Sequence, residues 1–281
     1  MSQEIETKAN GTVYIKESSN PRRPYEHQEE ALRNLDIIDR LDSFSTLVVL
    51  ATGGGKTYTA STWLLKNAID KGEKVLWLAH QHILLEQAAE SFMEYAYRSI
   101  VPHIDSFNYR IVSGAKNHDR LIKVKPTDDI LFLSKGSARK QNLYRLDEWL
   151  EGEDVIYFVI DEAHHSTAKG YRDVIDYLAG KVPNLKMIGL TATPTRTSEN
   201  EKGLLAKIFR DGVENEKIVQ NNIGMAFKVD LTTLINRRIL SRPVFESHYT
   251  GEKYGENLGL RALKSIEQKD NLPDDISDRR G

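Results

Sequence analysis

Short apolar runs alternate with longer segments of helical period along most of the chain. The apolar runs are rich in branched residues and have the length of strands, whereas the segments between them repeat apolar side chains three and four positions apart. Five runs stand out, at residues 46–50, 75–79, 130–133, 155–160 and 187–190. Most of them are apolar at consecutive positions, which is typical of parallel strands buried on both faces. The pattern predicts an α/β fold in which helices cover both faces of a parallel sheet.

Helical periodicity follows the first two of these runs. Residues 58–69 form the first predicted helix, and the second has one apolar stripe. The stripe consists of Leu84, Leu85, Ala88, Ala89, Phe92 and Ala96. Near the C-terminal end, residues 224–228 have the pattern of a further strand, and Asp230 can cap a helix that runs to Arg238. The sequence therefore predicts one further strand and one further helix after the five central runs.

The two ends of the chain are more polar than its centre. The N-terminal end contains only a weak strand at 13–15, and residues after about 250 are mostly polar, with several Gly and Asp. We therefore divide the chain into an arm at 1–22, a domain at 23–245, and a tail or linker at 246–281.

Composition narrows the class of protein. With 281 residues, 40% of them hydrophobic, the chain can build a substantial core, which excludes a disordered protein. It contains no cysteine, so disulfides, thiolate metal sites and a cysteine nucleophile are excluded. Its apolar runs are too short to span a membrane and its N-terminus lacks the pattern of a signal peptide, so we expect a cytoplasmic protein. The formal net charge of -2 neither indicates nor excludes nucleic-acid binding.

A glycine cluster between the first strand and its helix has the chemistry of a phosphate-binding loop. The glycines at 53–55 allow backbone N–H groups to turn around phosphate oxygens, and the helix N-terminus adds positive partial charge. Lys56 can then reach the β- and γ-phosphates, and the Thr57 hydroxyl can ligate Mg²⁺. The general motif has a glycine where this chain has Leu50. A glycine-rich tight turn is the alternative, which the Gly-Lys-Thr sequence disfavours.

Two acidic residues follow the apolar run at 155–160. Asp161 lies where the strand ends, and a carboxylate there can hold Mg²⁺, commonly through water. Glu162 beside it can polarise an attacking water. The alternative is an acidic helix N-terminus, which stabilises the helix without any chemistry. The phosphate loop upstream favours the catalytic interpretation.

Two threonines follow the next strand. Thr191 and Thr193 lie at a strand terminus that Pro194 ends, and their hydroxyls can pass hydrogen bonds between neighbouring sites. Taken alone, an ordinary capped turn before a helix is the better explanation of these residues.

In this order, the three segments resemble the first motor lobe of superfamily 2 helicases and translocases. The similarity is greatest to the DEAH-type branch, which includes restriction-enzyme motor subunits and related DNA translocases. Residues 51–57 resemble motif I, 161–164 resemble motif II, and 191–194 resemble motif III. The resemblance implies a RecA-like ATP-binding domain of the P-loop type over about residues 22–245. It also accounts for Leu50, because this branch often has an apolar residue there.

The resemblance also implies roles for individual residues. Residues 23–28 resemble the adenine-reading segment, in which Gln28 would bond the adenine edge while Tyr25 or Arg23 packs against the base. The implied nucleotide-binding residues are Arg23, Tyr25, Gln28, Thr52, Gly53, Gly54, Gly55, Lys56 and Thr57. The implied catalytic residues are Lys56, Asp161, Glu162 and His164, with Thr57 and Asp161 on Mg²⁺. Thr191 and Thr193 would couple nucleotide state to nucleic acid, and His164 would bond toward the other lobe.

Two further segments resemble the parts of the family that touch nucleic acid. Residues 76–87 resemble motif Ia, and 130–138 resemble the next strand and its loop. The implied nucleic-acid contacts are His80, Gln81, Ser134 and Ser137. Gln81 stands where the family often has a basic residue, and Gly136 where it often has glutamine. At these positions, backbone amides and the hydroxyls of Ser134 or Ser137 can still contact the nucleic-acid strand.

Several other residues have ordinary explanations. Trp63, Trp77, Trp149 and Tyr95 are interpreted as packing residues. His80 and His82, and the adjacent His164 and His165, lack the cysteines or acidic cluster of a metal site, and we expect His165 to have no fixed role. A stretch of basic residues flanks the loop after residue 133, which is predicted to contact a nucleic-acid strand. This stretch is either a solvated surface or a nucleic-acid contact. It comprises Arg120, Lys123, Lys125, Lys135, Arg139, Lys140 and Arg145.

The leading hypothesis is an ATP-dependent motor lobe that uses ATP and Mg²⁺ and acts on nucleic acid, DNA in preference to RNA. No second phosphate-facing lobe follows Pro243, so we expect full activity to need a second RecA-like lobe, in cis or in a partner chain. The alternative is a nucleotide-gated binding or assembly module that completes a composite site with a partner and does not hydrolyse ATP alone. A small-molecule kinase would share the phosphate loop, but it leaves 161–164 and 191–194 unexplained.

Overall fold

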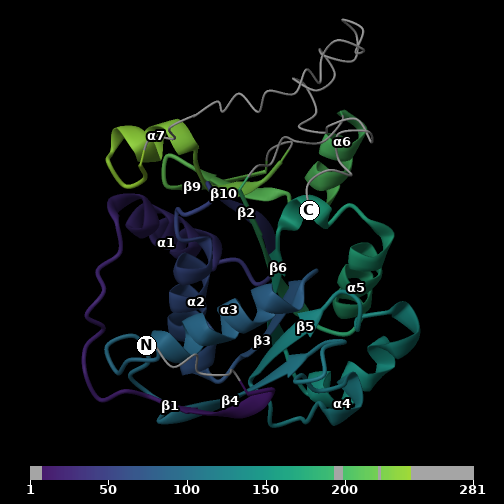
Figure 1. The fold of residues 1–281 in the computed structure, drawn as a ribbon. Coiled ribbons are helices and arrows are strands. Elements are labelled where there is room, and N and C mark those ends of the chain that lie inside the picture. Colours follow the sequence, from purple (N-terminus) through teal and green to yellow (C-terminus); the bar gives the residue numbers. More distant parts are fainter. Residues whose placement is uncertain (1–7, 193–198, 221–222, 242–281) are drawn as a thin grey trace, which may run out of the picture. The chain divides into compact units, whose positions relative to one another are not determined.

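The sheet at the centre of the fold has eight strands in the order β1-β4-β5-β3-β6-β7-β2-β10 (Figure 1). A computed structural model describes residues 8–192, 199–220 and 223–241. In chain order, the sheet strands are β1 Asn10–Tyr14, β2 Phe44–Leu50, β3 Lys74–Ala79, β4 Ser106–Val112, β5 Ile130–Ser134, β6 Val155–Asp161, β7 Asn184–Thr191 and β10 Met225–Val229. Every neighbouring pair is parallel except β1 with β4. A separate antiparallel hairpin joins β8 Asp211–Glu214 to β9 Lys217–Gln220.

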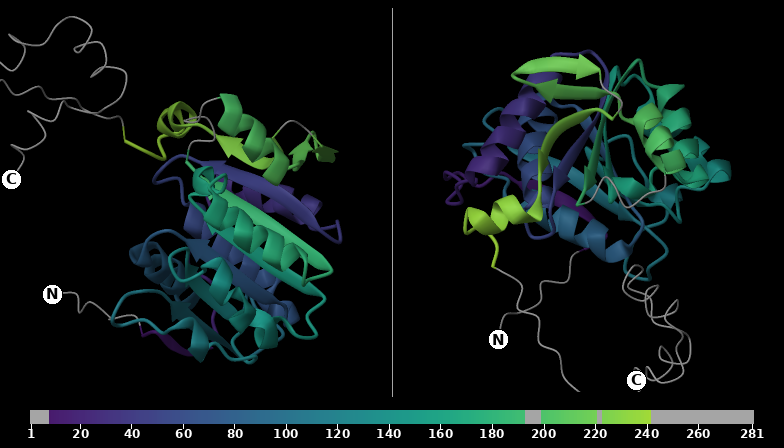
Figure 2. Two further views of the ribbon diagram at one scale, coloured as in Figure 1. Left: turned by 90° about the vertical axis from the view of Figure 1, so that its right-hand side faces the viewer. Right: turned by 90° about the horizontal axis from the view of Figure 1, so that it is seen from above.

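Helices cover both faces of the sheet, as Figure 2 shows. The α-helices are α1 Glu26–Ile38, α2 Lys56–Asn67, α3 His82–Glu94, α4 Asp147–Leu150, α5 Lys169–Ala179, α6 Glu199–Ile208 and α7 Leu231–Asn236. Short 3₁₀ turns are η1 Ile69–Lys71, η2 Leu121–Lys123, η3 Lys140–Leu146 and η4 Ala163–His165. Helices α1, α2 and α3 pack on one face, and α4, α5 and α6 pack on the other. The predicted α/β fold with a parallel sheet covered on both sides is confirmed.

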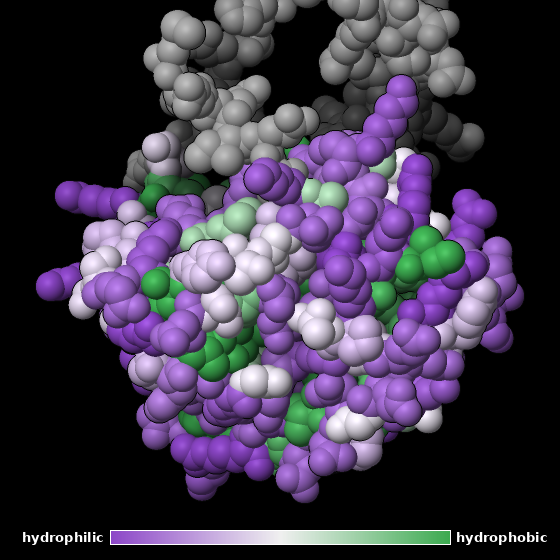
Figure 3. Space-filling view, turned by 90° about the horizontal axis from the view of Figure 1, so that it is seen from below, coloured by the Kyte–Doolittle hydropathy of each residue, from purple (hydrophilic) through white to green (hydrophobic). Residues whose placement is uncertain are grey.

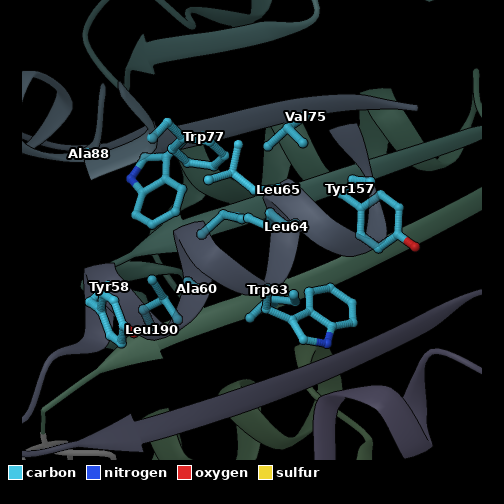
Figure 4. Packing of buried hydrophobic residues seen from close by; sticks show 14 of the residues in the cluster. Tyr58, Ala60, Trp63, Leu64, Leu65, Val75, Trp77, Ala88, Tyr157 and Leu190 are labelled. Atoms are coloured by element: carbon cyan, nitrogen blue, oxygen red, sulfur yellow. The ribbon is translucent and has the colours of Figure 1, made fainter. Parts of the chain in front are cut away.

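The strands divide their side chains between two hydrophobic cores because successive residues point to opposite faces. In β3, Val75 and Trp77 join the core under α2 and α3, whereas Leu76 and Leu78 join the core under α5. Figure 4 shows the first core, in which Trp63 and Leu64 of α2 lie among residues of the sheet strands. The three tryptophans are at most 1% exposed and Tyr95 is 6% exposed, which confirms that all four are packing residues.

The predicted strands are confirmed, with small extensions at their ends. The helix after Gly55 and the apolar stripe of α3 are also confirmed. Asp230 caps α7 as predicted, because its carboxylate accepts a hydrogen bond of 2.8 Å from the backbone N–H of Thr233. The weak strand predicted at 13–15 is observed as β1, which lies within the predicted N-terminal arm and adds an antiparallel edge to the sheet.

The hydrophobic pattern missed β4 and the helices α1 and α5. Strand β4 has Arg110 near its end, and this arginine is only 5% exposed. Its guanidinium is held by Asp128, with Nε 2.7 Å from a carboxylate oxygen, and also by Asp119. Because both partners come from a later part of the chain, the sequence around Arg110 gives no sign that a charged residue belongs inside a strand.

The face of the molecule seen from below is largely hydrophilic. Figure 3 views the molecule from below and shows polar side chains with smaller hydrophobic areas between them. Among the described residues, no helix is long and apolar enough to cross a membrane.

Candidate functional site

The loop between β2 and α2 is a glycine turn that only glycine can readily form. Gly53 and Gly55 have φ angles of 81° and 85°, in the left-handed region that L side chains rarely adopt. A Cβ atom at Gly55 would lie 2.3 Å from the Gln28 Nε2 atom, so Gln28 would have to leave its present position. The backbone N–H of Gly54 donates to the carbonyl of Ala51 at 2.8 Å and closes the turn. Lys56 and Thr57 then begin α2 and are partly exposed.

Two buried side chains of α1 hold this loop from behind. Gln28 Nε2 donates to the Gly54 carbonyl at 3.1 Å, and His27 Nε2 lies 2.9 Å from the same oxygen. Gln28 is 1% exposed and His27 is 0% exposed. The side-chain Oε1 of Gln28 also accepts a hydrogen bond of 3.0 Å from the backbone N–H of Tyr25. Gln28 therefore bonds the predicted phosphate loop within the chain itself, and His27 is a loop-supporting residue that the sequence interpretation missed.

The predicted base-packing residues lie at the surface. Tyr25 is 52% exposed, and its ring stacks beside that of His27 with centroids 5.9 Å apart. Arg23 is exposed as well. The neighbouring Arg22 is exposed too, but its guanidinium lies 3.9 Å from the centroid of the Tyr58 ring and donates a hydrogen bond of 2.6 Å to the Tyr95 hydroxyl. Arg22 thus fixes the segment that leads into α1.

Replacing Gln28 with alanine is expected to have two separable effects. If Gln28 reads the adenine edge, ATP binds better than GTP, CTP or UTP, and Gln28→Ala flattens this preference by on the order of 1–3 kcal/mol. The variant also loses the bond to Gly54, so affinity for all nucleotides falls. His27→Ala is the matched control because it removes the other bond to Gly54 and should weaken all four nucleotides equally. Equal binding of the four nucleotides to the unmodified chain would refute base reading by Gln28.

The segment around α7 packs against the outer side of the same loop. A Cβ atom at Gly53 would lie 3.1 Å from Leu240 Cδ2, and one at Gly54 would lie 3.1 Å from Leu234 Cδ1. Leu234 is fully buried, and the backbone N–H of Leu240 bonds back to its carbonyl at 3.3 Å. The phosphate loop is therefore held between α1 and the chain that follows β10.

Shortening Leu240 is expected to weaken nucleotide binding although Leu240 belongs to no predicted contact. Leu240→Ala removes apolar contact worth on the order of 1 kcal/mol from the outer side of the loop, which would lower affinity about fivefold. Leu231→Ala is the control, because Leu231 starts α7, the helix that precedes Leu240, but is 48% exposed. Calorimetric titration with ATP measures both variants. Equal affinities would mean that the loop keeps its shape without Leu240.

The predicted catalytic residues converge at the carboxyl ends of β2 and β6. Lys56 Nζ lies 3.9 Å from Glu162 Oε1. Asp161 ends β6, and its carboxylate accepts the backbone N–H of Glu162 at 2.9 Å. Glu162 has φ 51° and ψ 54°, a left-handed conformation that is uncommon for glutamate. Strained backbone of this kind concentrates at functional sites, where it aims a side chain.

The Asp161 carboxylate is set apart by its surroundings. Burial raises the pKa of Asp161 to about 6, and the adjacent Glu162 carboxylate acts in the same direction. The hydrogen bond from the Glu162 backbone and the Lys56 ammonium oppose this shift. A buried carboxylate of this type is stabilised in its ionised form by a cation, so Asp161 has the electrostatics expected of a metal-facing group.

His164 lies within the lobe, between the acidic pair and the end of β7. Its Nδ1 atom is 3.2 Å from Glu162 Oε2 and 3.3 Å from the hydroxyl of Thr191. Thr191 is fully buried at the end of its strand. The structure therefore brings the predicted coupling residues Thr191 and His164 together. Thr193 lies outside the described residues.

The predicted nucleic-acid residues follow β3 and β5 at the same edge. His80 and Gln81 are exposed, and Gln81 precedes α3 as its N-cap residue. Ser134 is only 6% exposed, and its hydroxyl lies 3.1 Å from that of Ser137 within a tight turn. This turn is tied to β3 by the bond of 2.8 Å from the Lys135 N–H to the carbonyl of Ala79. Ser134 therefore shapes the turn, while Ser137 is partly accessible.

Most of the predicted basic stretch is exposed. The exposed members are Arg120, Lys123, Lys125, Arg139 and Lys140, whereas Lys135 and Arg145 are partly buried. Arg120 donates to the backbone carbonyl of Ser113 at 2.8 Å, and Arg145 lies over the ring of Tyr144. Both explanations of this stretch, solvated surface and nucleic-acid contact, are compatible with these positions.

The residues at this edge fit a Mg²⁺-bound nucleotide. Within the described part of the chain, no group of three or more His, Cys, Asp and Glu residues could hold a metal ion alone. Mg²⁺ in nucleotide sites typically takes one or two protein ligands and completes its shell with phosphate oxygens and water. The Thr57 hydroxyl and the buried Asp161 carboxylate form a donor set of that size, beside the glycine turn.

Comparison with known proteins gives a family match that covers more than half of the chain. The model of the family described as "Type III restriction enzyme, res subunit" matches residues 22–196. The chain is 25% identical over 230 residues to the "ATP-dependent DNA helicase MPH1" of Pyricularia oryzae, covering 80% of this chain and 19% of that protein. It is 29% identical over 168 residues to the "Type I restriction enzyme EcoAI endonuclease subunit" of Escherichia coli, covering 54% of this chain and 17% of that protein.

The same matches show what share of each relative's length the chain covers. The chain spans about a fifth of the length of the curated relatives that it matches. Among solved structures, the Hef helicase domain of Pyrococcus furiosus aligns with a TM-score of 0.44 and 23% identity, covering 64% of this chain and 36% of that chain.

Proposed function

The chain belongs to the family of Type III restriction enzyme res subunits, and on this premise we propose that it is the ATP-binding motor lobe of a DNA helicase or translocase. The family match confirms the relationship to superfamily 2 helicases and translocases that the motifs indicated. The proposal goes further in two respects: this lobe couples Mg²⁺-ATP to contact with a DNA strand, and it needs a second RecA-like lobe for full activity.

One observation carries the proposal. The ammonium of Lys56, at the end of a glycine loop, lies 3.9 Å from the carboxylate of Glu162, which follows the buried Asp161. A structural turn would need neither the lysine nor two carboxylates at one point. Phosphoryl transfer needs all three, because the phosphate charge, the metal ion and the attacking water must be held together.

In the proposed mechanism, each side chain has one task. The loop at 53–57 and the N-terminus of α2 hold phosphate oxygens, and Lys56 neutralises the charge on the β- and γ-phosphates. Thr57 and Asp161 would hold Mg²⁺, which supplies further charge neutralisation when it is bound. Glu162 orients and polarises the attacking water. Because His164 bonds toward both Glu162 and Thr191, a change at the phosphates is passed to the end of β7.

The proposed nucleic-acid surface lies at the same carboxyl edge of the sheet. His80, Gln81 and Ser137 are accessible there, and exposed cations follow β5. Such cations would bind the phosphate backbone without reading base sequence. We propose DNA over RNA because the relatives are named as DNA helicases and restriction-enzyme subunits.

A nucleotide-gated assembly module, which completes a composite site with a partner and does not hydrolyse ATP alone, is the second candidate. A module that only binds nucleotide does not need the Glu162 carboxylate, so the presence of this residue favours hydrolysis. Two assays on one preparation separate the candidates: titration with Mg²⁺-ATP and single-stranded DNA, and phosphate release with a second lobe added. Hydrolysis that depends on Glu162 supports the motor, whereas tight ATP binding without hydrolysis under all conditions supports the module. Absence of nucleotide binding would refute both.

A further inference from the structure

Three histidine rings form a row at the carboxyl edge of the sheet. The ring centroids of His164 and His165 are 4.1 Å apart, and those of His165 and His80 are 5.1 Å apart at an interplanar angle of 63°. His165 therefore stands between a residue of the η4 turn after β6 and a residue at the end of β3. The sequence alone predicts no fixed role for His165, because the ring that it contacts, that of His80, belongs to a residue far away in the sequence.

The first ring of the row is attached to the proposed ATP site. His164 bonds toward Glu162 at 3.2 Å, and Glu162 lies 3.9 Å from Lys56. A movement of Glu162 toward phosphate or water therefore reaches His164 directly. The ring of His165 is the next group in contact.

The last ring of the row is attached to the proposed DNA surface. His80 follows Ala79, whose carbonyl accepts the N–H of Lys135 at the start of the turn that contains Ser137. Partial burial and the neighbouring His165 ring lower the pKa of His80, which favours its neutral form at pH 7. A neutral ring packs against another imidazole without charge repulsion, so this contact is compatible with a mechanical link.

Metal binding is the alternative interpretation of three neighbouring histidines. The described residues contain no cluster of His, Cys, Asp and Glu with the geometry to hold a metal ion. The rings approach one another face to edge or tilted, as packed aromatic groups do. The row is thus a packing contact between two proposed binding surfaces.

We propose that His165 is a positioning residue that couples the two ligands by transmitting the arrangement of Glu162 and His164 to His80. This inference rests on the proposed function, since it requires nucleotide at one end of the row and DNA at the other. It predicts that shortening His165 leaves the affinity for Mg²⁺-ATP nearly unchanged while the effect of ATP on the DNA surface is lost.

The first test follows the His80 ring by NMR in the full chain. With ¹⁵N-labelled histidine, the imidazole signal of His80 is assigned by its loss in His80→Ala and then followed during titration with Mg²⁺ and a slowly hydrolysed ATP analogue. We expect the signal to shift in the unmodified chain, and the shift to fall by more than about half in His165→Ala. His165→Phe, which keeps a ring, should retain it. His103→Ala is the matched control, because His103 is an exposed histidine that precedes β4 at the opposite edge.

The second test measures thermodynamic linkage. Affinity for a fluorescent single-stranded DNA is measured with and without the ATP analogue, and the ratio of the two dissociation constants is expected to be about fivefold or more. In His165→Ala this ratio should approach one, while calorimetry gives the same ATP affinity as the unmodified chain. A His80 signal that shifts equally in His165→Ala, or that does not shift although the analogue binds, overturns the inference. Failure of the chain to bind the analogue at all refutes the proposed function, and this inference with it.

Discussion

Lys56→Ala is expected to abolish detectable binding of Mg²⁺-ATP while the fold stays intact. Lys56 is the one side-chain cation assigned to the phosphates, and each charge-assisted hydrogen bond lost is worth on the order of 1.5–3 kcal/mol. Two such bonds, to the β- and γ-phosphates, correspond to roughly a hundredfold loss of affinity or more. The fold loses little, because the contact of Lys56 with Glu162 is long, at 3.9 Å, and partly exposed.

The control for this experiment lies on the same helix. Lys66 is near the end of α2, is 62% exposed, and pairs with Asp36 at 3.8 Å. Lys66→Ala removes the same side chain from the same helix without approaching the phosphate loop, so its ATP affinity should equal that of the unmodified chain. Calorimetry or a fluorescent nucleotide measures binding, and circular dichroism with thermal unfolding checks the fold. A folded Lys56→Ala variant with unchanged affinity would remove the basis for placing phosphates at this loop.

The parts of the fold that could be predicted are those whose signal is local. The run at 155–160 is apolar at every position because β6 lies in the middle of the sheet, with both faces covered. The glycine cluster at 53–55 is readable because the left-handed angles at Gly53 and Gly55 leave few other residues possible. Asp230 caps α7 through a bond to a residue three positions away. In each case, cause and consequence lie within a few residues of one another.

The parts that could not be predicted depend on contacts between distant segments. His27 looks like an ordinary polar residue of a helix, and its support of Gly54 exists only because α1 packs behind the loop. Leu240 belongs to none of the sequence motifs, yet its side chain lies against Gly53. The family resemblance predicts that Ser134 contacts nucleic acid, but the turn after β5 leaves it only 6% exposed. Three-dimensional neighbours, and not residue types, decide these roles.

The same distinction applies to the candidate site. The order of the carboxylates and the phosphate loop along the chain implies a common edge, since parallel strands end together. The order of these motifs does not predict the hydrogen bond between His164 and Thr191, or the row of histidine rings that continues to His80. The sequence therefore predicts which chemistry is present, while the connection between the proposed ATP and DNA surfaces comes from the fold.

The second large effect concerns turnover. We expect the 281-residue chain to bind ATP but to hydrolyse it very slowly, with little stimulation by DNA and no strand separation. Phosphoryl transfer needs the γ-phosphate charge to be neutralised from more than one side, and the proposed site, as built from the described residues, offers Lys56 and, when bound, Mg²⁺ from one side. In related phosphate-loop enzymes, an arginine supplied from elsewhere raises turnover by about 10³- to 10⁵-fold.

Glu162→Gln turns this expectation into a test that separates the lobe from the complete motor. In the chain alone, the variant should change the slow rate only modestly, because the missing charge already limits the reaction. When a second RecA-like lobe is added, in cis or as a partner protein, DNA-stimulated phosphate release should rise by orders of magnitude. Glu162→Gln should then abolish that gain, because its amide cannot take up a proton from the attacking water. Rapid, DNA-stimulated hydrolysis by the purified chain alone would mean that it supplies its own arginine, and the requirement for a second lobe would be wrong.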